Sequence, residues 1–261
     1  MVATVFGISA TAFLGLLGLV YLRQEKLLFF PEPLPDDFPR AMPDFEPVSI
    51  RVEGATLFAV HLKLPQPKGV VFFLHGNAGN VKDWIGDPQF YRTANFDLVM
   101  IDYRGYGRSS GRIESETQLH SDVAVAWEQI AVRYQHLRKV VYGRSLGTAL
   151  AARLAARIQP DLTVLVSAYW SIAELARLHY PLLPSFLLRY PMMTFKDIGR
   201  IDKRVLLIHG DQDRLIPFEH SERLRALVPD AELVRVTGAG HNDLQDFDQY
   251  LQAIAGALAR L

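Results

Sequence analysis

VVYGRSLGTALAARLAARI, residues 140–158, contains the change of pattern that decides the fold. It begins with apolar, partly β-branched residues typical of a buried strand, breaks at Gly143, and continues as an alanine-rich run with leucines at helical spacing. Parallel strands need a crossover connection of this kind, usually a helix. The stretch therefore predicts an α/β fold, and it places a serine, Ser145, at the junction between two glycines.

Similar apolar runs recur along the rest of the chain. Several are continuous, as expected for a sheet that is covered on both faces, and helical patterns lie between the later ones. The turn signal at Glu53-Gly54 indicates one antiparallel hairpin, and the alternation that follows favours a mostly parallel, doubly wound sheet. The expected strands are residues 48–52, 55–64, 70–75, 97–102, 139–143, 162–167, 204–209 and 232–237.

One stretch interrupts the alternation of strand and helix. Residues 168–200 are crowded with aromatic, leucine, methionine and proline side chains, which is typical of a cap inserted between two strands. These side chains would either cover the sheet or line an apolar substrate pocket, and both roles are compatible. We therefore expect an α/β domain over residues 47–261 with a short cap at about 168–200.

The N-terminus has a composition of its own. Residues 2–22 carry no charged side chain, and a helix of that length would span roughly 30 Å, the thickness of a bilayer core. Because no basic segment precedes the run, a cleaved signal peptide fits less well than an uncleaved anchor. We therefore predict a single transmembrane helix over residues 1–24, with membrane as a partner. Arg23 and Lys26 follow the run, and these two charges point only weakly to a cytoplasmic domain.

Residues 25–46 are rich in proline and acidic residues, which disfavours regular structure. We expect this segment to be an extended connector between the anchor and the folded domain.

Charge and composition exclude several classes of function. Lysine plus arginine and aspartate plus glutamate each number 28, so no net positive field recruits nucleic acid. The chain has no cysteine, which excludes disulfides, thiolate metal sites and a cysteine nucleophile. The histidines outside the motifs described below form no pattern typical of a metal site, so no metal is expected.

Ser145 lies where ligands bind in an open α/β sheet, beyond the carboxyl end of a strand. Gly143 to Gly147 fits G-x-S-x-G, in which a sharp turn exposes a nucleophilic serine. A serine that only caps the following helix would fit the same five residues, so partners are needed to decide. His241 follows a late strand in VTGAGHND, and Asp211 and Asp213 follow the strand before it in LLIHGDQD.

HGNAGN (75–80), DYRGYGRS (102–109), GRSLG (143–147), HGDQD (209–213) and GAGH (238–241) follow one another at expected strand ends. This ordered set resembles the α/β-hydrolase superfamily from Pro47 to the C-terminus. The apolar start followed by QEKLLFFPEP (24–33) resembles, more narrowly, a membrane-anchored branch that includes fungal bud-emergence and depalmitoylating serine hydrolases.

The resemblance implies a role for each matching residue. Ser145 would be the nucleophile and His241 the general base, and Asp213 would orient His241, with Asp211 as the alternative acid. The backbone N–H groups of Leu146 and Asn77 would form the oxyanion hole. No cofactor is implied.

The expected function is that of a serine hydrolase that cleaves carboxylic ester or thioester bonds through an acyl-enzyme. The apolar cap favours an acyl or lipid-like substrate. The same apparatus can also carry out amide or peptide hydrolysis or acyl transfer. The alternative to an enzyme is a membrane-tethered binding protein that has the same fold but no catalytic activity.

Overall fold

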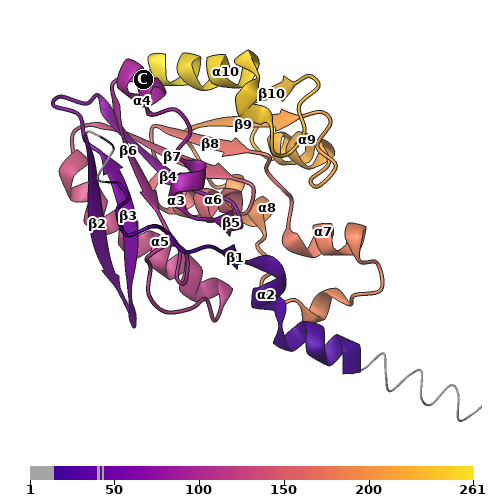
Figure 1. Ribbon diagram of the computed structural model, residues 1–261. Coiled ribbons are helices and arrows are strands. Elements are labelled where there is room, and N and C mark those ends of the chain that lie inside the picture. Colours follow the sequence, from indigo (N-terminus) through magenta and orange to yellow (C-terminus); the bar gives the residue numbers. More distant parts are fainter. Residues whose placement is uncertain (1–14, 40–41, 43) are drawn as a thin grey trace, which may run out of the picture.

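In the part of the chain that the computed structural model describes, residues 15–39, 42 and 44–261, eight strands form the central sheet in the order β10-β9-β8-β7-β4-β6-β3-β2 (Figure 1). β3 is antiparallel to β2 and β6, whereas neighbours from β6 to β10 are parallel. The predicted mostly parallel α/β sheet is therefore confirmed. The strands are β2 (Phe45–Val52), β3 (Ala55–Leu62), β4 (Gly69–Leu74), β6 (Phe96–Ile101), β7 (Arg138–Arg144), β8 (Leu162–Val166), β9 (Arg204–Gly210) and β10 (Glu232–Val236).

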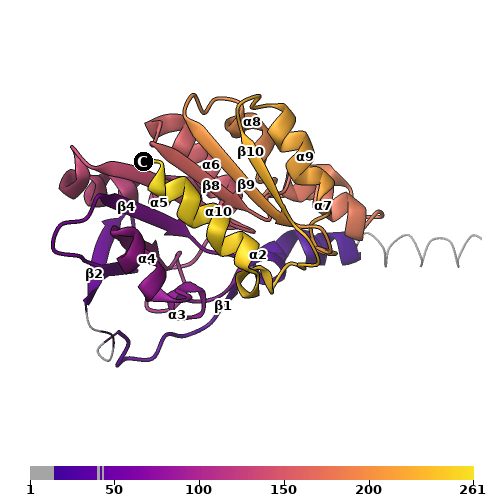
Figure 2. The ribbon, with the colours of Figure 1, turned by 90° about the horizontal axis from the view of Figure 1, so that it is seen from above.

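Helices cover both faces of this sheet, as the view from above shows (Figure 2). α5 and α6 pack on one face, and α4 and α10 pack on the other. The helices of the domain are α3 (Val81–Trp84), α4 (Pro88–Ala94), α5 (Glu116–Ala131), α6 (Gly147–Ile158), α7 (Ile172–His179), α8 (Thr194–Ile198), α9 (Glu219–Ala226) and α10 (Asp248–Ala259), with short 3₁₀ turns at Val132–Tyr134, Ser185–Leu187 and Leu244–Asp246.

The central strands explain why the sheet needs two helical layers. Every residue of β4, β6 and β8 is buried, so alternate side chains of each strand point into the two core layers. Burying one such Val, Leu or Ile side chain contributes roughly 1.5–3 kcal/mol. The continuous apolar runs in the sequence therefore correspond to strands with no solvent-facing side.

The residues between β8 and β9 leave the sheet and form α7, a 3₁₀ turn and α8. α7 has no buried residue, and the loop after it exposes large apolar side chains: Tyr180 at 68%, Leu182 at 78% and Phe186 at 83%. This part of the chain, residues 168–200, is called the cap below.

The prediction of a transmembrane helix over residues 1–24 is wrong on the described residues. No helix within residues 15–39, 42 and 44–261 has both the length and the apolar composition that crossing a bilayer requires. Residues 15–22 are helical and span about 12 Å, and residues 1–14 lie outside the described residues.

The chain turns at residue 23 and continues as α2 (Gln24–Leu28), which carries Glu25 and Lys26 and buries Gln24 against the cap. The described end of the uncharged run, residues 15–22, therefore leads into a polar segment that contacts the domain. The inference of a cytoplasmic domain depended on the predicted transmembrane helix.

A second, two-stranded sheet lies beside the central one. β1 (Phe30–Pro31) pairs in parallel with β5 (Ala78–Gly79), and Pro33 forms a bridge to Gly107. The N-terminal segment therefore reaches the loop that follows β4, at the carboxyl end of the sheet.

Candidate active site

Ser145 lies in a sharp turn between β7 and α6. Its φ angle is +51°, a left-handed conformation that costs a non-glycine residue of order 1–3 kcal/mol. A Cβ on Gly143 would lie 2.5 Å from the carbonyl oxygen of Gly147, and a Cβ on Gly147 would lie 2.0 Å from that of Leu74. Both glycines are therefore needed, because they let the strand, the turn and the helix approach closely enough to hold the serine in this conformation.

The side chains of Ser145, His241 and Asp213 meet at the carboxyl ends of β7, β9 and β10. Nε2 of His241 lies 3.0 Å from Oγ of Ser145, and Nδ1 of His241 lies 2.7 Å from Oδ2 of Asp213. Because a carboxylate accepts from Nδ1–H, Nε2 is the ring nitrogen that accepts the Ser145 hydroxyl proton. Ser145 and Asp213 are 6% and 7% exposed, and the turn is therefore largely shielded from water.

Four groups hold the Asp213 carboxylate. Oδ1 accepts the backbone N–H groups of Leu215 and Ile216 at 2.9 and 2.8 Å, and Oδ2 lies 3.3 Å from Nε2 of His209 in addition to its contact with His241. Burial by itself would raise the pKa of this carboxyl, but the hydrogen bonds from His209, His241 and Ile216 hold the pKa below its ordinary value. Asp213 is therefore ionised at neutral pH.

Asp211, the alternative acid, has a different position. Its Oδ1 accepts the backbone N–H of Gly238 at 2.8 Å and so ties the loop after β9 to the loop after β10. Within the described ranges, His241 makes its carboxylate contact with Asp213 and not with Asp211.

The two backbone N–H groups expected to bind an oxyanion are available. Among the residues that the structure describes, neither Leu146 N–H nor Asn77 N–H donates to a protein acceptor. Leu146 directly follows Ser145 at the start of α6, and Asn77 lies in the loop after β4. We call residues 75–79 the oxyanion loop.

Aromatic side chains surround this loop. The hydroxyl of Tyr103 donates to the carbonyl of His75 at 2.8 Å, and that of Tyr106 donates to the carbonyl of Asn77 at 2.7 Å. Both tyrosines also pack on the His75 ring, with centroids 4.2 and 5.2 Å away. Sequence reasoning missed these two tyrosines, although both belong to the DYRGYG motif.

His75, the first residue of the loop, forms a buried pair with Asp102. Nε2 of His75 is 3.6 Å from Oδ1 of Asp102, and both side chains are fully buried. Burial lowers the pKa of His75 to about 4 and raises the pKa of Asp102 to about 7, although the Val81 N–H favours the ionised form of Asp102. His75 is therefore neutral at neutral pH and serves the packing of the loop.

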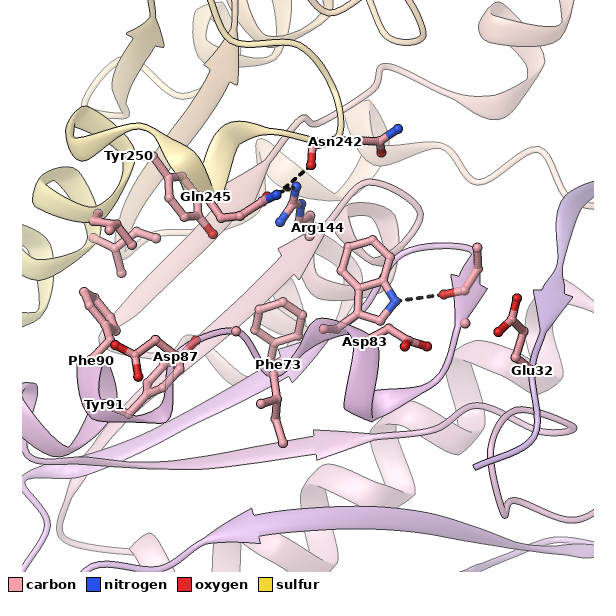
Figure 3. A pocket seen from close by; sticks show the side chains of 17 residues that line it. Glu32, Phe73, Asp83, Asp87, Phe90, Tyr91, Arg144, Asn242, Gln245 and Tyr250 are labelled. Carbon is pink, nitrogen blue, oxygen red and sulfur yellow. Dashed lines mark hydrogen bonds between the residues drawn. The ribbon is translucent and has the colours of Figure 1, made fainter. Parts of the chain in front are cut away.

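A cavity of about 670 Å³ adjoins the loops that carry Ser145 and His241 (Figure 3). Arg144, next to the serine in sequence, lies in it beside Gln245 and Asn242, and its guanidinium donates to Oε1 of Gln245 at 2.9 Å. Aromatic side chains also line the cavity, namely Phe73, Trp84, Phe90, Tyr91 and Tyr250. No residue of the cap lines this cavity, although the cap was the segment in which the sequence suggested a pocket.

Within residues 15–39, 42 and 44–261, no group of three or more histidine, cysteine, aspartate or glutamate side chains could hold a metal ion.

Family models and relatives match the chain across this site. A model described as "Serine aminopeptidase, S33" matches residues 65–197, and one described as "alpha/beta hydrolase fold" matches residues 193–248. Alpha/beta hydrolase domain-containing protein 17B of Xenopus laevis is 34% identical over 209 residues, which cover 75% of this chain and 68% of that protein. The human protein of the same name is 33% identical over 201 residues, which cover 73% of this chain and 66% of that protein.

Solved structures share the fold. An esterase from Pyrococcus furiosus has a TM-score of 0.71 at 19% identity, covering 89% of this chain and 97% of that chain. Est1E from Butyrivibrio proteoclasticus, solved with ferulic acid bound, has a TM-score of 0.67 at 19% identity, covering 82% of this chain and 96% of that chain.

Proposed function

Because the chain belongs to the α/β-hydrolase superfamily and is a serine hydrolase, we propose that it hydrolyses carboxylic ester or thioester bonds through an acyl-enzyme on Ser145. The observation that carries this proposal is the pair of hydrogen bonds by which His241 joins Ser145 Oγ, at 3.0 Å, to Asp213 Oδ2, at 2.7 Å. A serine, a base within reach and a third group that orients the base are the elements of nucleophilic catalysis.

In the first half of the reaction, Oγ of Ser145 attacks the acyl carbonyl carbon while its proton moves to Nε2 of His241. The carbonyl oxygen becomes an oxyanion, which the N–H groups of Leu146 and Asn77 are free to bind. When the tetrahedral intermediate collapses, the alcohol or thiol leaves with the proton from Nε2, and the acyl group stays on Ser145.

In the second half, water attacks the acyl-enzyme. His241 takes a proton from the water and returns it to Oγ of Ser145 as the acid product leaves. Asp213 stays ionised throughout, because its hydrogen bonds hold its pKa below the ordinary value, and it stabilises the imidazolium formed in each half.

The substrate that fits best has an acyl chain. The cap exposes Leu182 and Phe186 to solvent, and exposed apolar side chains of this size favour contact with an apolar substrate. The structural neighbours named esterases support an ester as the bond that is cleaved.

The test compares wild type with Ser145→Ala on p-nitrophenyl esters from acetate to palmitate and on a matched thioester series. A fluorophosphonate probe, which reports an activated serine, is applied to both proteins. We expect wild type to label and to prefer chains longer than acetate, and Ser145→Ala to fold but neither label nor turn over.

Activity on acetate alone would contradict the acyl-chain proposal and leave the triad assignment intact. Turnover confined to aminoacyl p-nitroanilides would replace the ester with an amide. A folded wild type that neither labels nor hydrolyses any of these substrates would contradict the proposed function.

A further inference from the structure

The segment Gln24–Pro33, which we call the strap, touches both the cap and the oxyanion loop. It consists of α2, Phe29, β1 and two residues beyond, and the central sheet begins only later, at Phe45. The strap therefore lies outside the sheet and its helical layers and still reaches the proposed catalytic machinery (Figure 1).

At the cap end, the amide of Gln24 is 2% exposed and makes two hydrogen bonds to backbone. Nε2 donates to the carbonyl of Leu187 at 2.6 Å, and Oε1 accepts the N–H of Arg189 at 2.8 Å. Glu25 adds an ion pair with Arg189 at 2.6 Å and accepts the hydroxyl of Tyr190 at 2.8 Å. A shift of the strap would leave the buried amide of Gln24 without its two hydrogen-bond partners, which is unfavourable.

At the other end, the strap pairs with the oxyanion loop. Phe30 N–H donates to the carbonyl of Asn77 at 2.8 Å, and Glu32 N–H donates to that of Gly79 at 3.1 Å. The side-chain amide of Asn77 donates back to the carbonyl of Leu28 at 3.2 Å. Asn77 is thus bound to the strap through both its backbone and its side chain.

The carbonyl of Asn77 has a second donor, the hydroxyl of Tyr106 at 2.7 Å. Two donors from different segments fix the direction of this carbonyl. They therefore also restrict the rotation of residue 77, whose own N–H has no protein acceptor among the described residues.

We propose that Gln24 and Tyr106 are positioning residues for the oxyanion hole, which they orient through the strap and Asn77. This inference rests on the proposed function, since it concerns the use of Asn77 N–H in the same reaction. The strap couples the position of the oxyanion loop to that of the cap, because this one short segment is hydrogen bonded to both. Neither residue touches the reacting atoms.

The test uses the full chain and a short p-nitrophenyl ester, on which cap contacts with the acyl chain matter least. Gln24→Met keeps the side-chain length and removes both hydrogen bonds, and Tyr106→Phe removes only the hydroxyl. Because an oxyanion contact acts in the transition state, we expect each variant to lower kcat by about tenfold with KM within about twofold. Since both act through Asn77, the double variant should lose less than the product of the two factors.

Matched controls lie away from the loop. Gln129→Ala removes an amide that donates to the carbonyl of Arg51, and Tyr134→Phe removes a buried hydroxyl that contacts Asp97. Both should leave kcat within about twofold, even where Tyr134→Phe lowers the melting temperature. If Gln24→Met does not fold, Glu25→Gln weakens the same cap contact at a half-buried position.

Unchanged kcat in both variants, with wild type active and labelled, would overturn the strap inference alone. Independent losses that multiply in the double variant would also overturn it, because they would show two separate structural effects. A wild type that neither labels nor hydrolyses would overturn the proposed function, and the inference with it.

Discussion

Nε2 of His209 lies 3.3 Å from Oδ2 of Asp213, the same oxygen that is 2.7 Å from Nδ1 of His241. One carboxylate oxygen is thus placed between two imidazole rings. His209 is itself fixed, because its Nε2 lies 2.8 Å from the carbonyl of Ile216 and its Nδ1 lies 2.7 Å from the hydroxyl of Ser221. His209 therefore supports the position of Asp213 in addition to His241.

Replacing His209 should affect both stability and turnover. We expect His209→Asn to lower the free energy of unfolding by about 1–3 kcal/mol, since buried partners lose their hydrogen bonds, and to lower kcat by about tenfold through a looser Asp213. Urea unfolding and steady-state kinetics measure the two effects. His61→Asn is the control, because His61 is equally buried but contacts Asp97 and Tyr134 instead. An equal loss of kcat in both variants would contradict a specific role for His209.

Asp213→Asn should lower kcat by about 10⁴-fold, because the amide favours the wrong tautomer of His241. It should also change acid stability. The folded-state pKa of Asp213 is held below its unfolded value, so its stabilisation is present above about pH 4 and is lost as the pH falls further. Unfolding measured from pH 6 to pH 2 should therefore show a smaller loss of stability in the variant than in wild type. If the free energies of unfolding of the variant and of wild type fell in parallel over this pH range, the prediction would be contradicted.

Asp102 should have the opposite pH dependence. Burial raises its folded-state pKa to about 7, so the folded protein keeps a proton that the unfolded chain releases near pH 4. This contribution to stability is present below about pH 4 and is lost as the pH rises to about 7. The free energy of unfolding of Asp102→Asn, relative to wild type, should therefore increase across that window in urea titrations. A difference independent of pH would refute the prediction.

Gly147→Ala should destabilise the fold by about 1–3 kcal/mol or more, because its Cβ would lie 2.0 Å from the carbonyl oxygen of Leu74. Activity should fall with it, since the turn that holds Ser145 must move. Gly256→Ala in α10 is the matched control. Its nearest neighbour would be 3.6 Å away, so stability should stay the same or rise by up to about 1 kcal/mol. Thermal melts of the two variants give the comparison.

The sheet could be predicted from the sequence because its signals are local. Runs such as residues 70–74 and 205–208 are apolar throughout, and such a continuous run is the pattern of a strand buried on both faces. The order of Ser145, Asp213 and His241 after successive strand ends is also visible in the sequence, and the structure brings these side chains within hydrogen-bond distance.

What the sequence could not predict depends on contacts between distant segments. The pairing of Phe30 with Ala78 and the burial of Gln24 against residues 187 and 189 leave no periodic pattern. The aromatic lining of the cavity could not be predicted either, because it comes from four separate elements, β4, α3, α4 and α10. The error at the N-terminus had another cause. The absence of charge over residues 2–22 describes composition, whereas a membrane span also needs one helix of sufficient length.

The pairing of β1 with β5 also changes where the smallest complete catalytic unit begins. A shortened chain that starts at Phe45 would retain every strand of the large sheet and all the helices packed on it. It would nevertheless leave the carbonyls of Asn77 and Gly79 without their donors from Phe30 and Glu32. The segment that holds the loop after β4 therefore begins at Gln24, and a domain boundary drawn at the edge of the sheet would separate the proposed active site from part of its support.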